Sequence, residues 1–249
     1  MALHSTTLRI EQLLGAETSR ILTRARDLRR DSGRDLLPTT LTPLDHLLAG
    51  GLPRGQLVEL NGRRSSGRFS VVLAVLASAT GSGEAAALID LGDGLDPQAA
   101  AEAGVDLSRL LWARPRRTQQ ALAGSELLLH SGFPLVVLDL GNPPVSGGRG
   151  SEAGWMRLAR AAAARESALL VSSPYRVSGS AAATVIEAHS ARPRWQGAGA
   201  SPRLLDALTP RLELKKLGGS PVERSARLVL EAGGGRRGGA CPRPPLEVP

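Results

Sequence analysis

From residue 56 onward, short apolar runs alternate with stretches in which apolar residues recur at helical spacing. The run from Leu135 to Leu140 has the length and continuity of a strand that is buried on both faces. This alternation is typical of a parallel sheet with crossover helices, so we predict an α/β fold. The predicted strands are 56–60, 86–91, 109–113, 135–140 and 168–172, and the predicted helices are 68–80, 97–104, 117–131 and 152–166.

The N-terminal part has a helical pattern of its own. Over residues 8–30, leucines recur near helical spacing and predict an amphipathic helix. Its second half carries an arginine cluster, which is either a solvated basic face or a docking surface for DNA or an acidic partner. The cluster consists of Arg20, Arg24, Arg26, Arg29 and Arg30.

The C-terminal part ends the predicted core. Runs 211–217 and 225–231 flank a Gly-Gly pair and predict a β-hairpin that closes the sheet. The last residues are rich in Gly, Pro and Arg, a composition typical of disorder. We therefore divide the chain into an Arg-rich helix (1–36), a core (37–232) and a basic tail (233–249).

Composition narrows the class of protein. Only 2% of the 249 residues are aromatic, so the core must be aliphatic. The net charge of +8 favours an acidic or polyanionic partner, although all but two of the 31 basic residues are arginines, a bias that a GC-rich genome also produces. A single cysteine, Cys241, excludes a disulfide framework, and we expect no metal site. With no apolar run of about 18 residues, we expect a cytoplasmic protein without a membrane partner.

A glycine-rich stretch follows the first predicted strand and opens a predicted helix. Gly62 and Gly67 have the spacing of the phosphate-binding pattern G-x-x-x-x-G-K-[ST], but Arg68 replaces the Lys and Phe69 replaces the hydroxyl residue. Asp139, at the end of a later strand, has the place of a Walker B carboxylate. The candidate residues of the loop are Gly62, Ser65, Ser66, Gly67, Arg68, Phe69 and Ser70.

The segments around this loop are similar, in order and spacing, to the RecA recombinase core. The similarity extends over about residues 37–231 and is greatest from 44 to 107. The matching residues are Leu44-Asp45, Gly50-Gly51-Leu52-Pro53-Arg54-Gly55, Val58-Glu59-Leu60, Gly62, Ser65-Ser66-Gly67, Ile89-Asp90, Leu95-Asp96-Pro97 and Gly104-Val105-Asp106-Leu107.

The resemblance also implies which residues would act in ATP hydrolysis, and most of them are replaced. The glutamate that activates water falls on Gly92, and the sensor glutamine falls near Pro174. Asp139 remains, Arg68 keeps a charge suited to phosphate, and Ser70 offers a neighbouring hydroxyl. Loss of such groups typically costs orders of magnitude in rate. We therefore expect no catalytic residues, no efficient hydrolysis and no ATP or magnesium cofactor.

The segments that carry DNA in RecA are short in this chain. The first lies between Leu140 and Trp155, and the second lies between Tyr175 and Ala183. Trp195 is a candidate for base stacking or for ordinary packing. Basic residues nearby are candidate contacts for DNA or for a protein partner, with plain surface charge as the alternative. They are Arg176, Arg192, Arg194, Lys215 and Lys216.

A short RecA-like core without the catalytic set, preceded by an Arg-rich helix, resembles the ImuA family. The resemblance implies a nucleoid-associated accessory role in translesion synthesis during the SOS response. The implied partners are RecA, an ImuB-like Y-family protein with its associated polymerase, and single-stranded DNA. Three alternatives stay open: a SulA-like inhibitor of cell division, a slow DNA-dependent ATPase of the RecA family, and an unrelated α/β protein.

Overall fold

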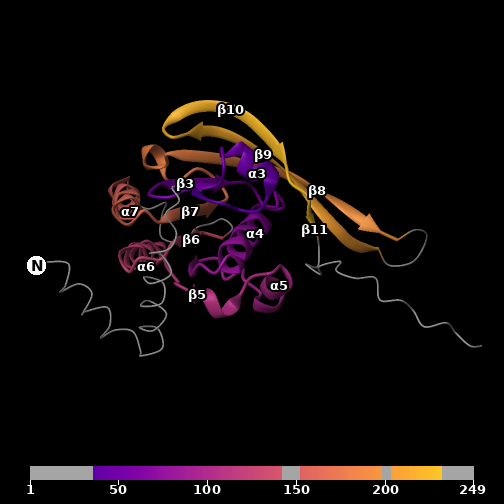
Figure 1. Cartoon of the computed structure of the whole chain (residues 1–249), viewed down its shortest axis with the longest axis horizontal. Helices are drawn as coiled ribbons and strands as arrows, with labels where there is room; N and C mark the ends of the chain where they lie inside the picture. Colours follow the sequence, from indigo (N-terminus) through magenta and orange to yellow (C-terminus); the bar gives the residue numbers. More distant parts are fainter. Residues whose placement is uncertain (1–35, 142–151, 198–202, 232–249) are drawn as a thin grey trace, which may run out of the picture.

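The computed structural model describes residues 36–141, 152–197 and 203–231. These residues form an α/β fold with a nine-stranded, mostly parallel sheet, which confirms the predicted fold class (Figure 1). The strand order is β10-β9-β8-β3-β7-β6-β4-β5, and β11 pairs with β9. The predicted N-terminal helix, the basic tail and most of the segment between Leu140 and Trp155 lie outside the described residues.

The parallel part of the sheet contains all five strands that the apolar runs predict. Their ends agree with the prediction to within a residue. The apolar residues of four of these strands are buried between two layers of helices, whereas the edge strand 110–113 is half-buried. Adjacent members of this part pair in parallel, so their carboxyl ends share one edge. The strands are β3 (Leu57–Asn61), β4 (Ala86–Asp90), β5 (Leu110–Ala113), β6 (Leu135–Asp139) and β7 (Ala168–Ser173).

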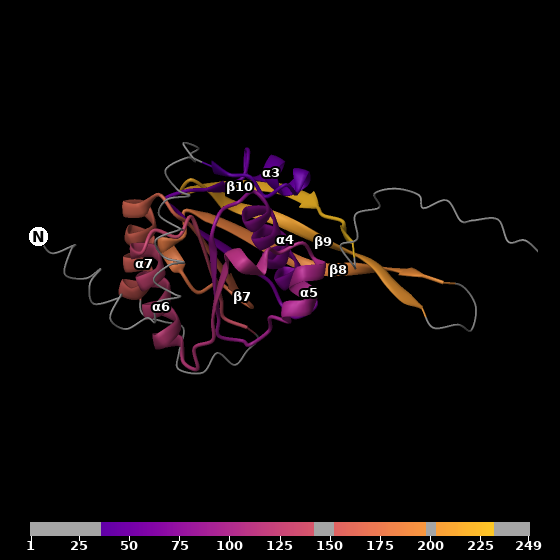
Figure 2. The same ribbon diagram turned by 60° about the horizontal axis from the view of Figure 1, so that its bottom comes forward.

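Helices cover the two faces of this sheet (Figure 2). On one face lie α4 (Arg68–Gly81) and α5 (Pro97–Glu102), and on the other lie α6 (Thr118–His130) and α7 (Glu152–Arg165). Side chains alternate along each strand, so Val58 joins the α4 core whereas Leu57 joins the α6 and α7 core. All four helices begin and end within two residues of the predicted limits. Among the described residues, no helix combines the length and apolar character needed to cross a membrane.

Small elements without a clear pattern were not predicted. They are α3 (Thr42–Leu47), the paired two-residue strands β1 (Leu36–Leu37) and β2 (Leu52–Pro53), and two 3-10 turns, η1 (Leu107–Arg109) and η2 (Gly179–Ala181). Elements this short contain too few residues to show a period. α3 packs beside the edge strand β10, and its Leu44 and Leu47 are buried.

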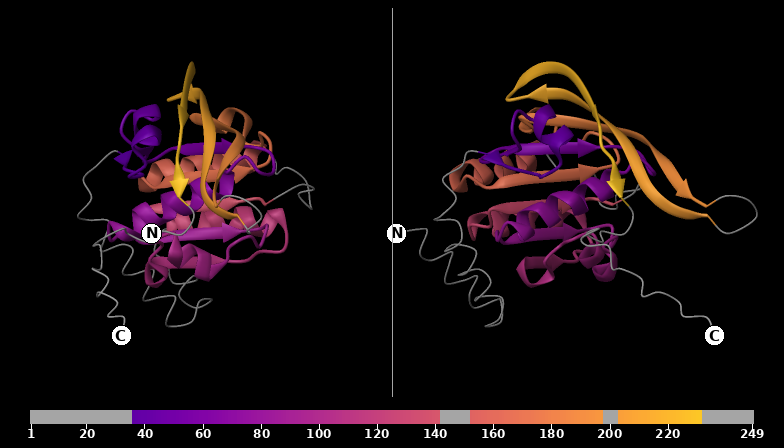
Figure 3. Two further views of the ribbon diagram at one scale, coloured as in Figure 1. Left: turned by 90° about the vertical axis from the view of Figure 1, so that its right-hand side faces the viewer. Right: turned by 45° about the vertical axis from the view of Figure 1, so that its right-hand side comes forward.

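The antiparallel end of the sheet departs most from the prediction. It contains β8 (Thr184–Gln196), β9 (Leu204–Leu217), β10 (Ser220–Arg227) and β11 (Leu230–Glu231). The β9–β10 hairpin is present, but its second strand begins five residues earlier than predicted, directly after Gly218 and Gly219, which both have positive φ. β8 was not predicted. Its outer half and that of β9 project from the core as a two-stranded arm, residues 192–196 and 204–209 (Figure 3).

Candidate functional site

The glycine loop connects β3 to α4 at the carboxyl edge of the sheet. Gly67 is the N-cap of α4 with a φ of 77°, and its carbonyl accepts a 3.0 Å hydrogen bond from the Val71 amide. Gly62 has no room for a side chain, because an added Cβ would lie 2.7 Å from the carbonyl oxygen of Ala188. Both glycines of the predicted pattern are therefore required by the backbone of this turn.

A cavity of about 580 Å³ opens above the loop. Loop residues, Asp139 and Gly92 form much of its wall, so the structure brings these candidate residues together. Gly94 and Gly141 also line it, and the base of the arm contributes Ala191, Pro193 and Leu208. The arm is fixed there, since the Ala191 amide donates to the Ser65 carbonyl at 3.1 Å. This wall was not predicted from the sequence, because β8 lacks apolar alternation at that point.

Arg68 turns inward from the first turn of α4 and binds the Walker B-like carboxylate. Its Nη1 donates to Asp139 Oδ1 at 2.7 Å and to the Ser172 hydroxyl, and its Nη2 donates to the Gly141 carbonyl at 2.6 Å. Only 7% of the Arg68 side chain and 3% of the Asp139 side chain are exposed. The guanidinium thus ties α4 to the ends of β6 and β7.

Asp139 is itself surrounded by donors. Besides Arg68, the Ser172 hydroxyl donates to Oδ1 at 2.6 Å and the Gly141 amide donates to Oδ2 at 3.0 Å. Burial raises the pKa of the Asp139 carboxyl above its ordinary value, and Arg68 and Ser172 oppose this rise. Both carboxylate oxygens are therefore occupied by hydrogen bonds from the protein.

The residues present do not fit the magnesium ion that the resemblance implies. Such an ion is held by the loop hydroxyl and by the Walker B carboxylate, directly or through water. Here the hydroxyl position is Phe69, the second residue of α4, which is partly buried and packs against the hydrophobic core. The carboxylate of Asp139 is bonded to the Arg68 guanidinium. Ser70 lines the cavity, but the described residues place no free carboxylate of the loop or of β6 beside it.

Gly92, at the place of the water-activating glutamate, is packed against Gly141. A Cβ added at Gly92 would lie 2.5 Å from the Gly141 Cα atom, closer than real side chains approach a backbone. The loop cannot easily move away, because buried Asp90 accepts hydrogen bonds from the amides of Gly94 and Leu95 at 3.0 and 2.9 Å. Position 92 therefore has no room for a side chain in this arrangement.

The loop after β7 is held by a buried carboxylate. Glu59, on β3, is fully buried and accepts a 2.6 Å hydrogen bond from the Val177 amide and a bond from the Ser178 hydroxyl. Pro174 is buried, and Arg176 is exposed in the same loop. The sequence identified Glu59 only as a matching residue and gave no sign of its partners, which lie 118 and 119 positions away.

Some of the basic residues proposed as contacts for DNA or a partner already bind other groups of the protein. Arg194 on the arm pairs with Asp206, Lys215 pairs with Glu213 at 2.8 Å, and Lys216 donates to the Ala182 carbonyl at 2.6 Å. Arg192 and Trp195 are both exposed on the arm, and Trp195 is 52% exposed. The five arginines of the N-terminal cluster lie outside the described residues.

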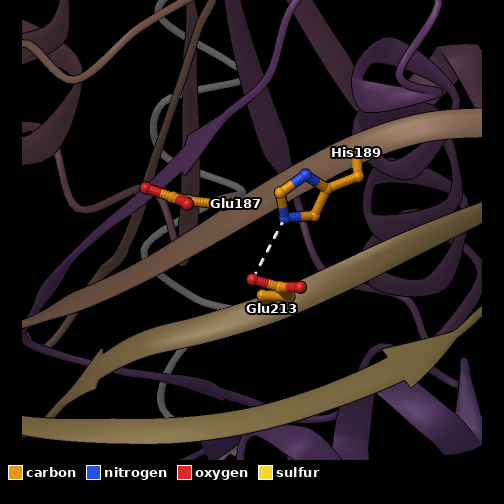
Figure 4. A group of neighbouring side chains, drawn as sticks. All are labelled: Glu187, His189 and Glu213. Carbon is orange, nitrogen blue, oxygen red and sulfur yellow. Dashed lines mark ion pairs between the residues drawn. The ribbon is translucent and has the colours of Figure 1, made fainter.

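Three side chains that could bind a metal ion lie close together on the neighbouring strands β8 and β9. The positions of the histidines in the sequence do not predict such a group. Ligand atoms of Glu187, His189 and Glu213 all lie within 4.8 Å of one another (Figure 4). Glu213 also accepts from Arg211 at 2.9 Å and from Lys215 at 2.8 Å. The hydrogen bond from Lys215 holds the pKa of Glu213 below its ordinary value. These cations already balance the carboxylates, so we interpret the group as a surface ion-pair network.

Comparison with known proteins agrees with this architecture. The chain is 42% identical over 107 residues to protein RecA of Tropheryma whipplei (strain Twist), a match that covers 42% of this chain and 24% of that protein. It is 43% identical over 107 residues to protein RecA of Kineococcus radiotolerans, covering 42% and 31%. The match thus spans less than a third of these curated relatives.

A solved structure and a family profile extend the comparison. The crystal structure of the RadB recombinase superposes with a TM-score of 0.58 at 17% identity, covering 77% of this chain and 94% of that one, which shows a shared fold. The profile of the RecA N-terminal domain matches residues 2–142, more than half of the chain. The chain belongs to the RecA N-terminal domain family.

Proposed function

We propose that this RecA-family chain does not hydrolyse ATP and acts as an accessory protein in the DNA-damage response. One observation carries the proposal: the Arg68 guanidinium is bonded to Asp139, the one acidic group that remains of the expected catalytic set. The protein then contributes a RecA-like surface to other proteins rather than a chemical step.

The chemistry of phosphoryl transfer supports this proposal. Catalysis there depends on positioned cations and on a group that orients the attacking water. In this chain the carboxylate is neutralised by Arg68, and the contact between Gly92 and Gly141 excludes a glutamate from position 92. Because water activation and metal binding are both affected, substitution of one residue would not restore turnover.

More specifically, we propose that the chain is an ImuA-type protein. A reduced RecA-like core that keeps its sheet and loses its catalytic groups suits a subunit that docks on RecA without a hydrolytic cycle. We propose RecA and an ImuB-like Y-family protein, with its associated polymerase, as partners in translesion synthesis. The exposed Trp195, Leu204 and Leu205 of the arm offer apolar surface for a protein contact.

The first test measures ATP hydrolysis by the full chain with and without single-stranded DNA. We expect phosphate release no faster than that of the Asp139→Ala variant. Release that depends on DNA and disappears in Asp139→Ala would instead identify a slow ATPase that uses Asp139.

The second test adds the protein to RecA on single-stranded DNA and follows filament assembly and strand exchange. We expect a change in assembly that depends on the concentration of this chain, together with capture of the purified ImuB-like protein. Unaltered filaments would contradict the accessory role. A SulA-like inhibitor would instead bind the GTPase that drives cell division and would not bind the ImuB-like protein.

A further inference from the structure

The bonded Arg68 changes what the cavity above the loop can hold. We infer that this cavity binds a polyphosphate group without a divalent cation, with the Arg68 guanidinium neutralising the carboxylate that a metal ion would otherwise bind. The inference goes beyond the proposed function, because it concerns how a ligand is held rather than whether it is cleaved. It follows from the poor fit of magnesium described above.

The loop supplies hydrogen-bond donors for an anion. The first-turn amides of α4, a helix of 14 residues, point toward the cavity end of the helix, which carries a partial positive charge. Ser66 adds a second and independent feature. Its side chain lines the cavity and is 3% exposed, and its hydroxyl has no hydrogen-bond partner among the described residues. A buried hydroxyl without a partner costs free energy that a bound phosphate oxygen would recover.

The charges around the cavity also favour an anion without a metal. Arg63 and Arg64 are exposed and line the cavity, whereas the charge of Asp139 is cancelled by Arg68. The lining therefore carries two uncompensated positive charges in the described part of the chain. In a site with a free carboxylate, magnesium would relieve repulsion between that carboxylate and the phosphates. Here that repulsion is already removed by an internal cation.

The part of the cavity wall opposite the loop is apolar. It leaves room for a further group of the ligand beyond its phosphates. Pro193 and Leu208, from the base of the arm, face the loop across the cavity. Its volume of about 580 Å³ lies within the range of small-molecule sites, roughly 300–1,000 Å³. A nucleotide and a free polyphosphate share the chemistry that the loop recognises. They differ in whether they need this apolar wall.

Calorimetric titration of the full chain tests the inference with two probes, ADP and inorganic pyrophosphate, each in magnesium and in EDTA. Neither measurement depends on ATP hydrolysis, so the result stands apart from the proposed lack of turnover. We expect Kd in EDTA to be within about twofold of Kd in magnesium for at least one probe. Binding of both probes identifies polyphosphate recognition, and binding of ADP alone identifies a nucleotide that uses the apolar wall.

Two outcomes of the titration itself would overturn the inference. They are a loss of affinity of about tenfold or more in EDTA, and no binding of either probe. The Arg63→Ala variant should fold normally, because the Arg63 side chain is exposed. This variant should bind the probes about tenfold more weakly than the parent chain. Arg160→Ala removes an exposed arginine from α7 and should leave Kd unchanged. Equal effects of the two variants would contradict a site at the loop.

Discussion

Two groups of charged side chains in this molecule use similar residues in opposite surroundings. Arg68 and Asp139 meet at 2.7 Å with side chains that are 7% and 3% exposed. Around Glu213, whose side chain is 19% exposed, the cations of Arg211 and Lys215 meet one carboxylate, and the neighbouring His189 side chain is 46% exposed. Burial, rather than the number of partners, decides how much each group matters, because water screens the second group and not the first.

The origin of the partners differs as well. Arg68 reaches acceptors at the end of β6, directly after it and on β7, 71 to 104 positions away, so its contacts hold separate elements together. The partners of Glu213 are near it on β9 or on the adjacent strand β8. Loss of a contact in the first group affects the centre of the fold, whereas loss in the second affects one strand pair.

The largest effect is expected when the buried pair is broken. Arg68→Ala leaves Asp139 as an uncompensated buried charge, which should lower the free energy of unfolding by about 3–5 kcal/mol. Denaturant unfolding measures the change, with Arg160→Ala as the exposed control, expected within about 0.5 kcal/mol of the parent. A double variant, Arg68→Met with Asp139→Leu, should recover much of the loss. A loss below about 1 kcal/mol in Arg68→Ala would contradict the role of the pair.

An intermediate effect is expected at the contact between Gly92 and Gly141. Gly92→Ala places a methyl group 2.5 Å from the Gly141 Cα atom and should destabilise the protein by about 1–3 kcal/mol. The matched control is Gly124→Ala, since no atom lies within 4 Å of its added Cβ on α6. That control should be stabilising by about 0.5–1 kcal/mol, because alanine favours the helix. Equal shifts in thermal unfolding for the two variants would mean that the contact imposes no restriction.

The smallest effect is expected in the exposed network. Glu213→Gln removes its charge but keeps its shape, and should change the free energy of unfolding by less than about 1 kcal/mol. Unfolding at low and high salt measures it, and the difference from the parent should shrink as salt screens the network. A change as large as that of Arg68→Ala would show that exposure does not separate the two groups.

The sequence predicts the parts of the fold that are regular and buried. Strands such as β6 are continuous apolar runs of strand length, and the helices on both faces have apolar residues at helical spacing. β8 was missed because its outer half, from Arg192 to Gln196, is exposed and carries charged residues and a proline where alternation is expected. Its strand conformation comes from pairing with β9, which is a tertiary effect.

The candidate site could be predicted only in part, for a related reason. The spacing of Gly62 and Gly67 located the loop, and the end of a strand located Asp139. The direction of the Arg68 side chain depends on residues distant in sequence, so the sequence alone left phosphate as its partner. The contact between Gly92 and Gly141 likewise joins two loops. The presence of a glycine in a loop does not reveal which distant residue packs against it.

Binding of manganese as a stand-in for magnesium tests the central claim most directly. Electron paramagnetic resonance of Mn²⁺ is recorded with the full chain and ADP, and compared with the same samples of Asp139→Asn. We predict equal free Mn²⁺ in both, because the Arg68 guanidinium already occupies the carboxylate of Asp139. Manganese that binds the parent chain with ADP, and is released in Asp139→Asn, would contradict the account.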